Sequence, residues 1–155
     1  MTDAGTVGDV VAAVDFSDRS HDVLDEGLTL ARALGAPLHL LHVAAGEPAL
    51  AGYDKDEISP FTRSARAGEL TDEHRRLREL ADQLAGDGVA VTPLVVMGPT
   101  AQMILDAGEH LQASHLVLGS HGHGGLHHLL VGSVAEEVVR HARVPVVLVP
   151  VRPSP

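Results

Sequence analysis

Hydrophobic residues in the first third of this chain fall into short apolar runs separated by a stretch of helical spacing. Val10–Val14 and Leu38–Val43 are runs of strand length, and between them apolar residues recur every three to four positions from Leu24 to Leu34. Gly35 and Pro37 end the helical spacing. The pattern predicts a strand, a helix capped by Ser17 or Ser20, and a second strand.

The next segment has no lasting period. From Ala44 to about Gly68 it is rich in Gly, Pro, Ser, Asp and Glu, which predicts a long mobile loop over residues 44–68. Beyond it the alternation resumes. The predicted elements are a helix over Leu70–Leu84, a strand over Val89–Met97, a helix after Thr100, a strand over Leu116–Leu118, a helix from Ser133 and a strand from Val144.

A glycine-rich segment lies between the fourth strand and the last helix. It places glycines at 119, 122 and 132 and a serine at 133. Glycine lets backbone N–H groups approach a bulky anion without an intervening side chain. Ser133-Val134-Ala135-Glu136 has the spacing of a capping box, which would set the positive end of a helix beside the loop. We interpret the segment as a phosphate-binding loop, with plain turn chemistry as the alternative.

The full spacing Gly119-x2-Gly122-x9-Gly132-Ser133 resembles the nucleotide-binding signature of the universal stress protein family. The resemblance covers nearly the whole chain as a single domain, 1–155, and includes Val11–Ser17, Leu40–Val43, Gly98 before a helix, and Val144–Val149. It implies a stress-response regulator that binds ATP (or ADP or AMP), with Mg²⁺, as a nucleotide-dependent binding switch.

The resemblance also assigns residues to the site. The residue at the position of Val43 meets adenine through its backbone, and those at Ala13 and Leu118 line the same pocket. Asp15 could accept a hydrogen bond from a ribose hydroxyl, although a cap or turn role is equally open. The predicted nucleotide-binding residues are Ala13, Asp15, Val43, Leu118, Gly119, His121, Gly122, His123, Gly132, Ser133 and Val134.

Two positions depart from the family pattern. His123 stands where a fixed cation is common, so phosphate affinity should depend on pH. Ala135 stands where a hydroxyl often meets phosphate, which removes a donor. The identity of the nucleotide is left open by these changes.

Alternating strands and helices predict an α/β fold with one open parallel five-stranded sheet and helices on both faces. Pro93 and Pro145 place the third and fifth strands at the edges. The order 3-2-1-4-5, which the resemblance to a Rossmann-like, adenine nucleotide alpha hydrolase-like fold also favours, satisfies these constraints. Ligands bind such sheets at the switch point, here between the ends of the first and fourth strands, Asp15 and Gly119.

Composition narrows the function further. The 155 residues carry a formal charge of −10 and only three aromatic residues, so nucleic acid is not an expected partner. The arginines at 75, 76 and 78 alternate with Glu73 and Glu79, which is typical of a solvated helix face. We find no P-loop, and the only lysine is Lys55. With no cysteine and no signal or membrane segment, a cytoplasmic protein without membrane insertion is expected.

Three alternatives to a pure binding protein stay open. His121, His123, His127 and His128 could share a metal ion, but nothing fixes their geometry and phosphate contact is favoured over a dedicated metal site. A slow ATP hydrolase or nucleotidyl-transfer enzyme of the same fold is the second, and a ligand-free interaction scaffold is the third. We expect no dedicated catalytic residues, although slow incidental hydrolysis of ATP is allowed.

The last strand predicts self-association. Val144–Val151 is apolar and has no charged residue before Arg152, yet it lies at a sheet edge with unpaired backbone groups. Members of the family that the chain resembles commonly pair this strand across a twofold axis. We therefore expect a homodimer through Val144–Val151, and an unidentified regulated protein as a further partner.

Overall fold

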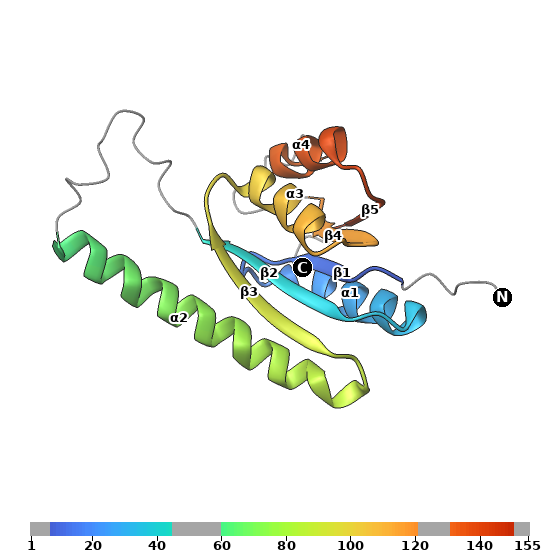
Figure 1. Ribbon diagram of the computed structural model, residues 1–155, viewed down its shortest axis with the longest axis horizontal. Coiled ribbons are helices and arrows are strands. Elements are labelled where there is room, and N and C mark those ends of the chain that lie inside the picture. The colour runs from blue at the N-terminus through green and yellow to red at the C-terminus, as the bar shows by residue number, and fades with distance from the viewer. Residues whose placement is uncertain (1–6, 45–59, 121–130, 151–155) are drawn as a thin grey trace.

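The computed structural model describes residues 7–44, 60–120 and 131–150 of the chain. Within these ranges strands and helices alternate along the sequence (Figure 1). The elements are β1 (Val10–Ala13), α1 (Ser20–Leu34), β2 (Leu38–Ala44), α2 (Pro60–Leu84), the 3-10 turn η1 (Ala85–Asp87), β3 (Val91–Met97), α3 (Thr100–His110), β4 (His115–Gly119), α4 (Ser133–His141) and β5 (Val146–Val149).

The five strands form one parallel sheet in the order β3-β2-β1-β4-β5. In the centre, Val10 of β1 is in register with Leu38 of β2 and with His115 of β4. The predicted order 3-2-1-4-5 is confirmed. Pro93 lies in the edge strand β3 and Pro145 directly precedes the edge strand β5, as expected for residues without a backbone N–H donor.

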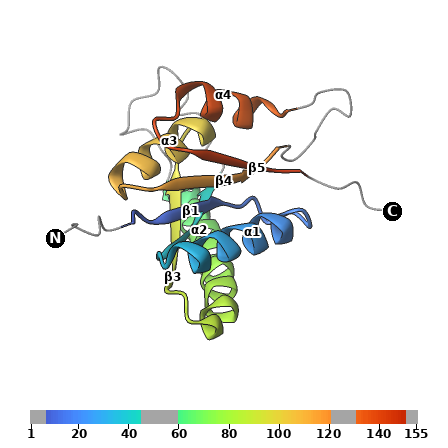
Figure 2. The same ribbon diagram turned by 90° about the vertical axis from the view of Figure 1, so that its right-hand side faces the viewer.

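Helices cover both faces of the sheet, with α1 and α2 on one face and α3 and α4 on the other (Figure 2). Successive strand residues therefore enter different cores. Val10 and Ala12 belong to the cluster under α1 and α2, whereas Val11 belongs to the cluster under α3 and α4. Burial on both sides explains why the strands read as continuous apolar runs rather than as alternating ones.

Two glycines set the distance between helices and strands. A Cβ added at Gly27 of α1 would lie 3.0 Å from the Cβ of Ala12, and one at Gly108 of α3 would lie 3.1 Å from Cδ2 of Leu116. Both contacts are tighter than ordinary van der Waals packing. Each glycine thus allows its helix to approach the sheet closely.

The predicted loop over residues 44–68 is partly wrong. Ala44 is the last residue of β2, and α2 already begins at Pro60, so positions 60–68 are helical. Proline is a favoured first residue of a helix because its missing N–H is not needed there. Residues 45–59 lie outside the described ranges, so the mobility of the loop stays a prediction.

The predicted cap of α1 is also wrong. Its N-cap residue is Arg19, which makes no side-chain capping bond, and Ser20 is the first helical residue. The hydroxyls of Ser17 and Ser20 bond instead to Asp15, at the end of β1. The nearby carboxylate of Asp15 has taken the place of the helix terminus as the partner of these hydroxyls.

Over the described ranges, no helix is both long enough and apolar enough to cross a membrane.

Candidate functional site

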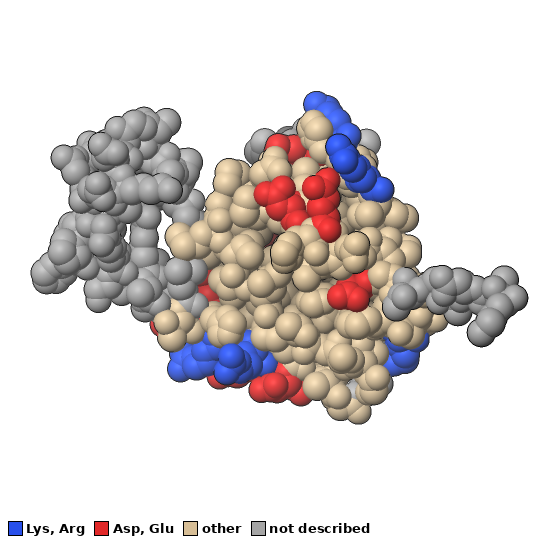
Figure 3. Space-filling view, in the orientation of Figure 1, with Lys and Arg blue, Asp and Glu red and all other residues tan. Residues whose placement is uncertain are grey.

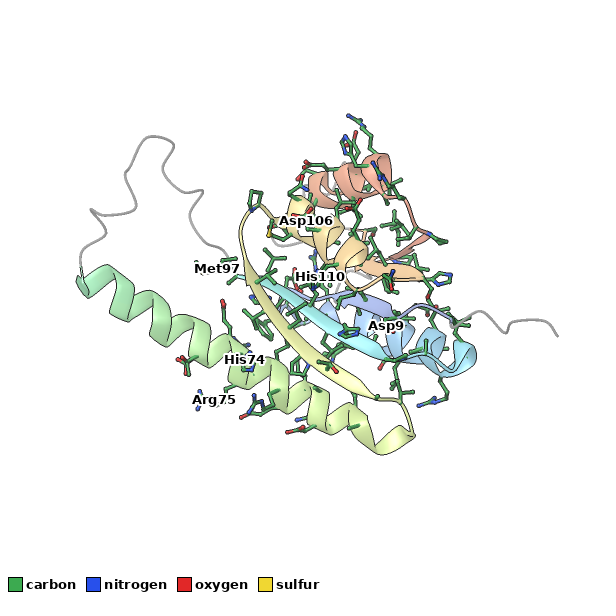
Figure 4. All side chains as sticks on the ribbon, in the orientation of Figure 1. Asp9, His74, Arg75, Met97, Asp106 and His110 are labelled. Atoms are coloured by element: carbon green, nitrogen blue, oxygen red, sulfur yellow. The ribbon has the colours of Figure 1, made fainter. Side chains whose placement is uncertain are left out.

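The candidate site lies at the carboxyl ends of β1, β2 and β4. Figure 4 marks the two ends of the sheet, with Asp9 at the start of β1 and Met97 at the end of β3. The chain leaves β1 toward α1 on one face, and it leaves β4 toward α4 on the other (Figure 2). The two neighbouring strands therefore define a switch point of the kind at which open α/β sheets bind ligands.

Three apolar residues predicted to line the site come together at this end of the sheet. Ala13 is the last residue of β1, and Val43 and Leu118 are the next-to-last residues of β2 and β4. Leu118 is buried, and the half-buried Ala13 and Val43 pack against the same cluster, on the α3 and α4 face. The grouping inferred from the resemblance is thus present as one apolar surface.

Asp15 forms a compact turn after β1. Its Oδ1 accepts hydrogen bonds from the Ser17 backbone N–H (3.0 Å), the Ser17 hydroxyl (2.5 Å) and the Ser20 hydroxyl (2.9 Å), while the Asp15 N–H donates to Ser20 Oγ at 3.3 Å. The turn role considered from the sequence is therefore present. It also fixes the direction of the carboxyl group, which is what a ribose contact would need.

Phe16 occupies the middle of this turn in the left-handed region, at φ 60°. That conformation is costly for a residue with a Cβ, and it persists only where surrounding contacts hold it.

Two residues near the ends of the glycine segment, Ser120 and Gly132, are hydrogen-bonded to each other at the carboxyl end of β4. The Ser120 N–H donates to the Val149 carbonyl (2.9 Å), and the Gly132 N–H donates to the Ser120 carbonyl (2.6 Å). Gly119, the last residue of β4, is in register with Val149 of β5. The start of α4 is thus held directly at the carboxyl end of β4.

The predicted capping box at the start of α4 is wrong. The N-cap residue is Gly132, which has no side chain to cap, and Ser133 is the exposed first residue of the helix. The first-turn N–H groups, at Ser133 and Val134, precede the first helical bond, in which Glu136 N–H donates to Gly132 O at 2.9 Å. Because intrahelical partners are lacking for such groups, they suit an anion better than a capped terminus would.

Part of the predicted site lies outside the described residues. His121, Gly122 and His123 belong to this part, as do His127 and His128 of the possible metal set. Within the described ranges, no group of three or more His, Cys, Asp or Glu side chains could hold a metal ion. The histidine hypotheses stay predictions.

A polar cluster beside the site was missed from the sequence. His42 of β2 is only 7% exposed, its Nδ1 lies 2.9 Å from the Val14 carbonyl oxygen, and its Nε2 lies 3.4 Å from Oε1 of Glu73 in α2. The Phe16 ring lies 4.3 Å from the His42 ring, and the Arg76 guanidinium lies 4.4 Å from the Phe16 ring. The available sequence signal for this cluster was His42, a histidine inside the apolar run Leu38–Val43.

The three arginines of α2, at 75, 76 and 78, are exposed, as predicted for a solvated helix face. Figure 3 shows arginine side chains gathered over α2. Arg75 is exposed, with Asp72 at 3.1 Å, and Arg78 lies 3.2 Å from His74 at the surface. Arg76 also lies on the Phe16 ring in the turn after β1, and the half-buried Glu73 faces His42 of β2.

An open parallel α/β sheet with a ligand site at its switch point is the class that this geometry defines. The universal stress protein family model matches residues 7–150, so the chain belongs to the universal stress protein family. Universal stress protein G of Salmonella typhimurium is 31% identical over 115 residues, covering 72% of this chain and 76% of the relative. A universal stress protein of Bacillus subtilis is 28% identical over 145 residues, covering 90% and 97%.

Solved structures share the fold. UspA from Lactobacillus plantarum superposes with a TM-score of 0.76 at 23% identity, covering 92% of this chain and 97% of that one. A universal stress protein in complex with cAMP (TM-score 0.62, 23% identity, 93% and 97% covered) and one from Archaeoglobus fulgidus in complex with dAMP (0.62, 20%, 93% and 98%) are also similar. At these identities the likeness establishes the fold.

Proposed function

We propose that this protein binds an adenine nucleotide between the Asp15 turn and the start of α4, and that nucleotide occupancy switches its binding to a regulated protein in a stress response. The observation that carries the proposal is the hydrogen bond from Gly132 N–H to Ser120 O, 2.6 Å, which holds an uncapped helix terminus at the end of β4. That terminus adjoins the central strand β1, which carries Asp15.

The start of α4 fits a phosphate. The uncapped N–H groups of its first turn and the helix dipole both favour negative charge. Gly132 has φ −70° and ψ 160°, an extended conformation that any residue can adopt. Its value at this position is therefore the missing side chain, which leaves room for an anion next to the backbone.

The carboxyl ends of the central strands fit the nucleoside. Ala13 and Val43 are half-buried and present an apolar surface, and Asp15 is oriented by Ser17 and Ser20. An apolar surface with a few fixed polar groups is typical of small-ligand sites. The cAMP and dAMP complexes of the similar proteins support adenine nucleotide binding by this fold.

ATP with Mg²⁺ is the ligand that we favour, with ADP and AMP as the other candidates. The metal would neutralise the phosphate charges while the α4 terminus binds them. We propose a binding switch rather than an enzyme, because the groups assembled at the site are backbone donors, apolar side chains and a carboxylate already engaged in a turn.

The test is direct binding of purified protein to ATP, ADP, AMP and cAMP by calorimetry, with and without Mg²⁺. The chain has no Trp and one Tyr, so a co-purified adenine nucleotide would also dominate its ultraviolet spectrum. Micromolar binding of at least one adenine nucleotide is expected. No binding to any of the four, together with nucleotide-free protein from cells, would refute the proposal.

We also propose that the protein forms a homodimer through Val144–Val151 and acts in the cytoplasm, where such a switch would meet the ATP pool. β5 supports the first part. It is an edge strand, and three of its four residues, Val146, Val147 and Leu148, are only partly covered by the protein's own helices. An uncovered apolar edge favours pairing with a second copy.

A further inference from the structure

The imidazole of His42 is buried but only half bonded. Its Nδ1 lies 2.9 Å from the Val14 carbonyl oxygen. Its Nε2 has no hydrogen-bond partner among the described residues, although Oε1 of Glu73 lies 3.4 Å away. A buried nitrogen aimed at a carboxylate without bonding to it calls for a chemical reason.

The tautomer supplies that reason. A carbonyl oxygen can only accept, so His42 Nδ1 must carry the hydrogen. In the neutral ring Nε2 then presents a lone pair, and the ionised carboxylate of Glu73 presents another. Neither atom can donate. One proton taken from solvent, on either Nε2 or Oε1, together with a small adjustment of the two side chains from their 3.4 Å separation, would convert this contact into a charge-assisted or neutral hydrogen bond.

The contact joins two elements that meet at the nucleotide site. His42 binds the carbonyl of Val14, directly before Asp15, and its ring also packs against Phe16, directly after Asp15. Glu73 belongs to α2. The state of this one pair therefore decides whether α2 is bonded, through His42, to the residue that leads into the Asp15 turn.

Other groups around the ring come from each neighbouring element. α2 also contributes Arg76, whose guanidinium lies on the Phe16 ring. The turn after β1 contributes the Asp15 carboxylate, which is bonded to Ser17 and Ser20. β3 contributes the apolar Val95, in register with His42. Glu73 is thus the carboxylate placed to share a proton with His42.

We propose that His42 and Glu73 form a proton-dependent link between α2 and the Asp15 turn, and that His42 is a positioning residue for Asp15. Proton uptake closes the link and proton loss opens it. In the open state, the Arg76 guanidinium on the Phe16 ring still joins α2 to the turn. The link itself does not depend on a ligand, whereas its effect on nucleotide affinity rests on the proposed function.

Two substitutions at one position separate this proposal from a merely structural role. In Glu73→Gln, the amide N–H can donate to the neutral Nε2, and the amide oxygen can accept from the protonated ring, so the link stays closed at every pH. In Glu73→Ala it stays open at every pH. Both variants remove the same charge, and only Glu73→Gln keeps a side chain that can form the bond.

The control is a second histidine–carboxylate pair on the same strand. Nε2 of His39 lies 2.6 Å from Oδ2 of Asp9, at the opposite end of the sheet from Met97 and three residues before His42 (Figure 4). Three residues along a strand reverse the face, so His39 points away from α2. His39→Asn should remove a comparable pair without affecting α2.

The first experiment uses nucleotide-free protein. Imidazole ¹⁵N shifts give the tautomer and titration of His42, and amide hydrogen exchange, corrected for intrinsic rates, gives the protection of α2 between pH 5.5 and 8. In the wild type and in His39→Asn, α2 around Leu77 should be about tenfold better protected at the acidic end, as for a bond to a charged group. Glu73→Gln should be protected at both ends and Glu73→Ala at neither.

The proposal is overturned if wild-type protection does not change with pH, if the Gln and Ala variants behave alike, or if neutral His42 carries its hydrogen on Nε2. A second arm measures nucleotide affinity in a His123→Arg background, which removes the other titratable group expected to affect binding. Two results together would support the positioning role: nucleotide binding that is tighter at acidic pH when Glu73 is present, and the disappearance of this pH dependence in Glu73→Gln. Absence of nucleotide binding would refute the proposed function, and the first arm would still decide the link.

Discussion

The backbone N–H of Gly132 lies 2.6 Å from the carbonyl oxygen of Ser120, so the chain that leaves β4 returns to the same point before α4 begins. This bond fixes where the first turn of α4 lies relative to β1 and β4. The helix terminus at the candidate site is thus held by a backbone bond rather than by a side chain. The first prediction tests that view.

Gly132→Val should lower adenine nucleotide affinity by at least tenfold, because a branched side chain would stand between the backbone and the phosphate. The backbone at Gly132 is extended, at φ −70°, so valine can adopt it without strain. Gly86→Val is the matched control, since a Cβ there meets nothing within 4 Å. Calorimetry should show weakened binding for the first variant and unchanged binding for the second; equal affinities would contradict the site.

Ser133→Ala should also weaken binding, by about 1.5–3 kcal/mol or roughly ten- to a hundredfold, if its hydroxyl donates to a phosphate. Ser133 is exposed and is not the N-cap of α4, so its loss should leave stability within about 0.5 kcal/mol. Calorimetry and urea unfolding on the same preparation separate the two effects. A variant that loses stability and keeps its affinity would assign Ser133 to the helix alone.

His123 should make phosphate binding depend on pH, because imidazole gains its positive charge only under mildly acidic conditions. ATP is expected to bind more tightly near pH 6 than near pH 8, and His123→Arg should flatten that dependence and raise affinity near pH 8. The comparison belongs in a Glu73→Gln background, which holds the His42 contact constant. An affinity that is flat in the presence of His123 would exclude the role.

Gly27→Val should destabilise the fold by about 1–3 kcal/mol, because its Cβ would lie 3.0 Å from the Cβ of Ala12 and α1 would have to move from the sheet. Ala12→Gly in the same chain should recover part of the loss, since it removes the opposing atom. Gly86→Val should stay within about 0.5 kcal/mol. Urea unfolding followed by circular dichroism measures the stability of all three variants. If Ala12→Gly recovers none of the stability lost in Gly27→Val, the loss would reflect helix propensity and not the contact with Ala12.

Val147→Lys should convert the expected dimer to monomer, because lysine on an edge strand opposes pairing. Val149 is unsuitable for this test because it is only 8% exposed within one copy. Val139→Lys on α4 is the control, as Val139 is 49% exposed and lies outside β5. Sedimentation should show a dimer for wild type and control only. A wild-type monomer at micromolar concentration would contradict the interface.

The strands of the sheet were predictable because the sequence signals that mark each strand lie within a few residues of one another. Apolar runs and glycine ends indicate the strands, whereas the order also relied on the two edge prolines, the parallel topology and the family resemblance. The apolar surface formed by Ala13, Val43 and Leu118 followed from the family resemblance. The helix terminus at Ser133 was placed correctly for a reason that proved wrong, since Gly132 is the N-cap.

The polar contacts were not predicted because nearby side chains have several partners to choose from and distant side chains meet only after folding. Ser17 and Ser20 read as local caps, yet the carboxylate of Asp15 offers them stronger acceptors. Likewise, no spacing rule connects His42 with Glu73, which meet only because α2 crosses β2 and β3 on one face. Side-chain partners at this range depend on how helices pack, which periodicity does not encode.

Phe16 marks a suitable position for an intrinsic fluorescent probe. Its ring is sandwiched between the imidazole of His42 and the guanidinium of Arg76, so it senses both β2 and α2 at once. The chain contains no tryptophan. An indole introduced at position 16 would therefore be the sole fluorophore of its kind, beside the proposed nucleotide site, and its emission could follow the turn, the helix and the ligand in real time without any added label.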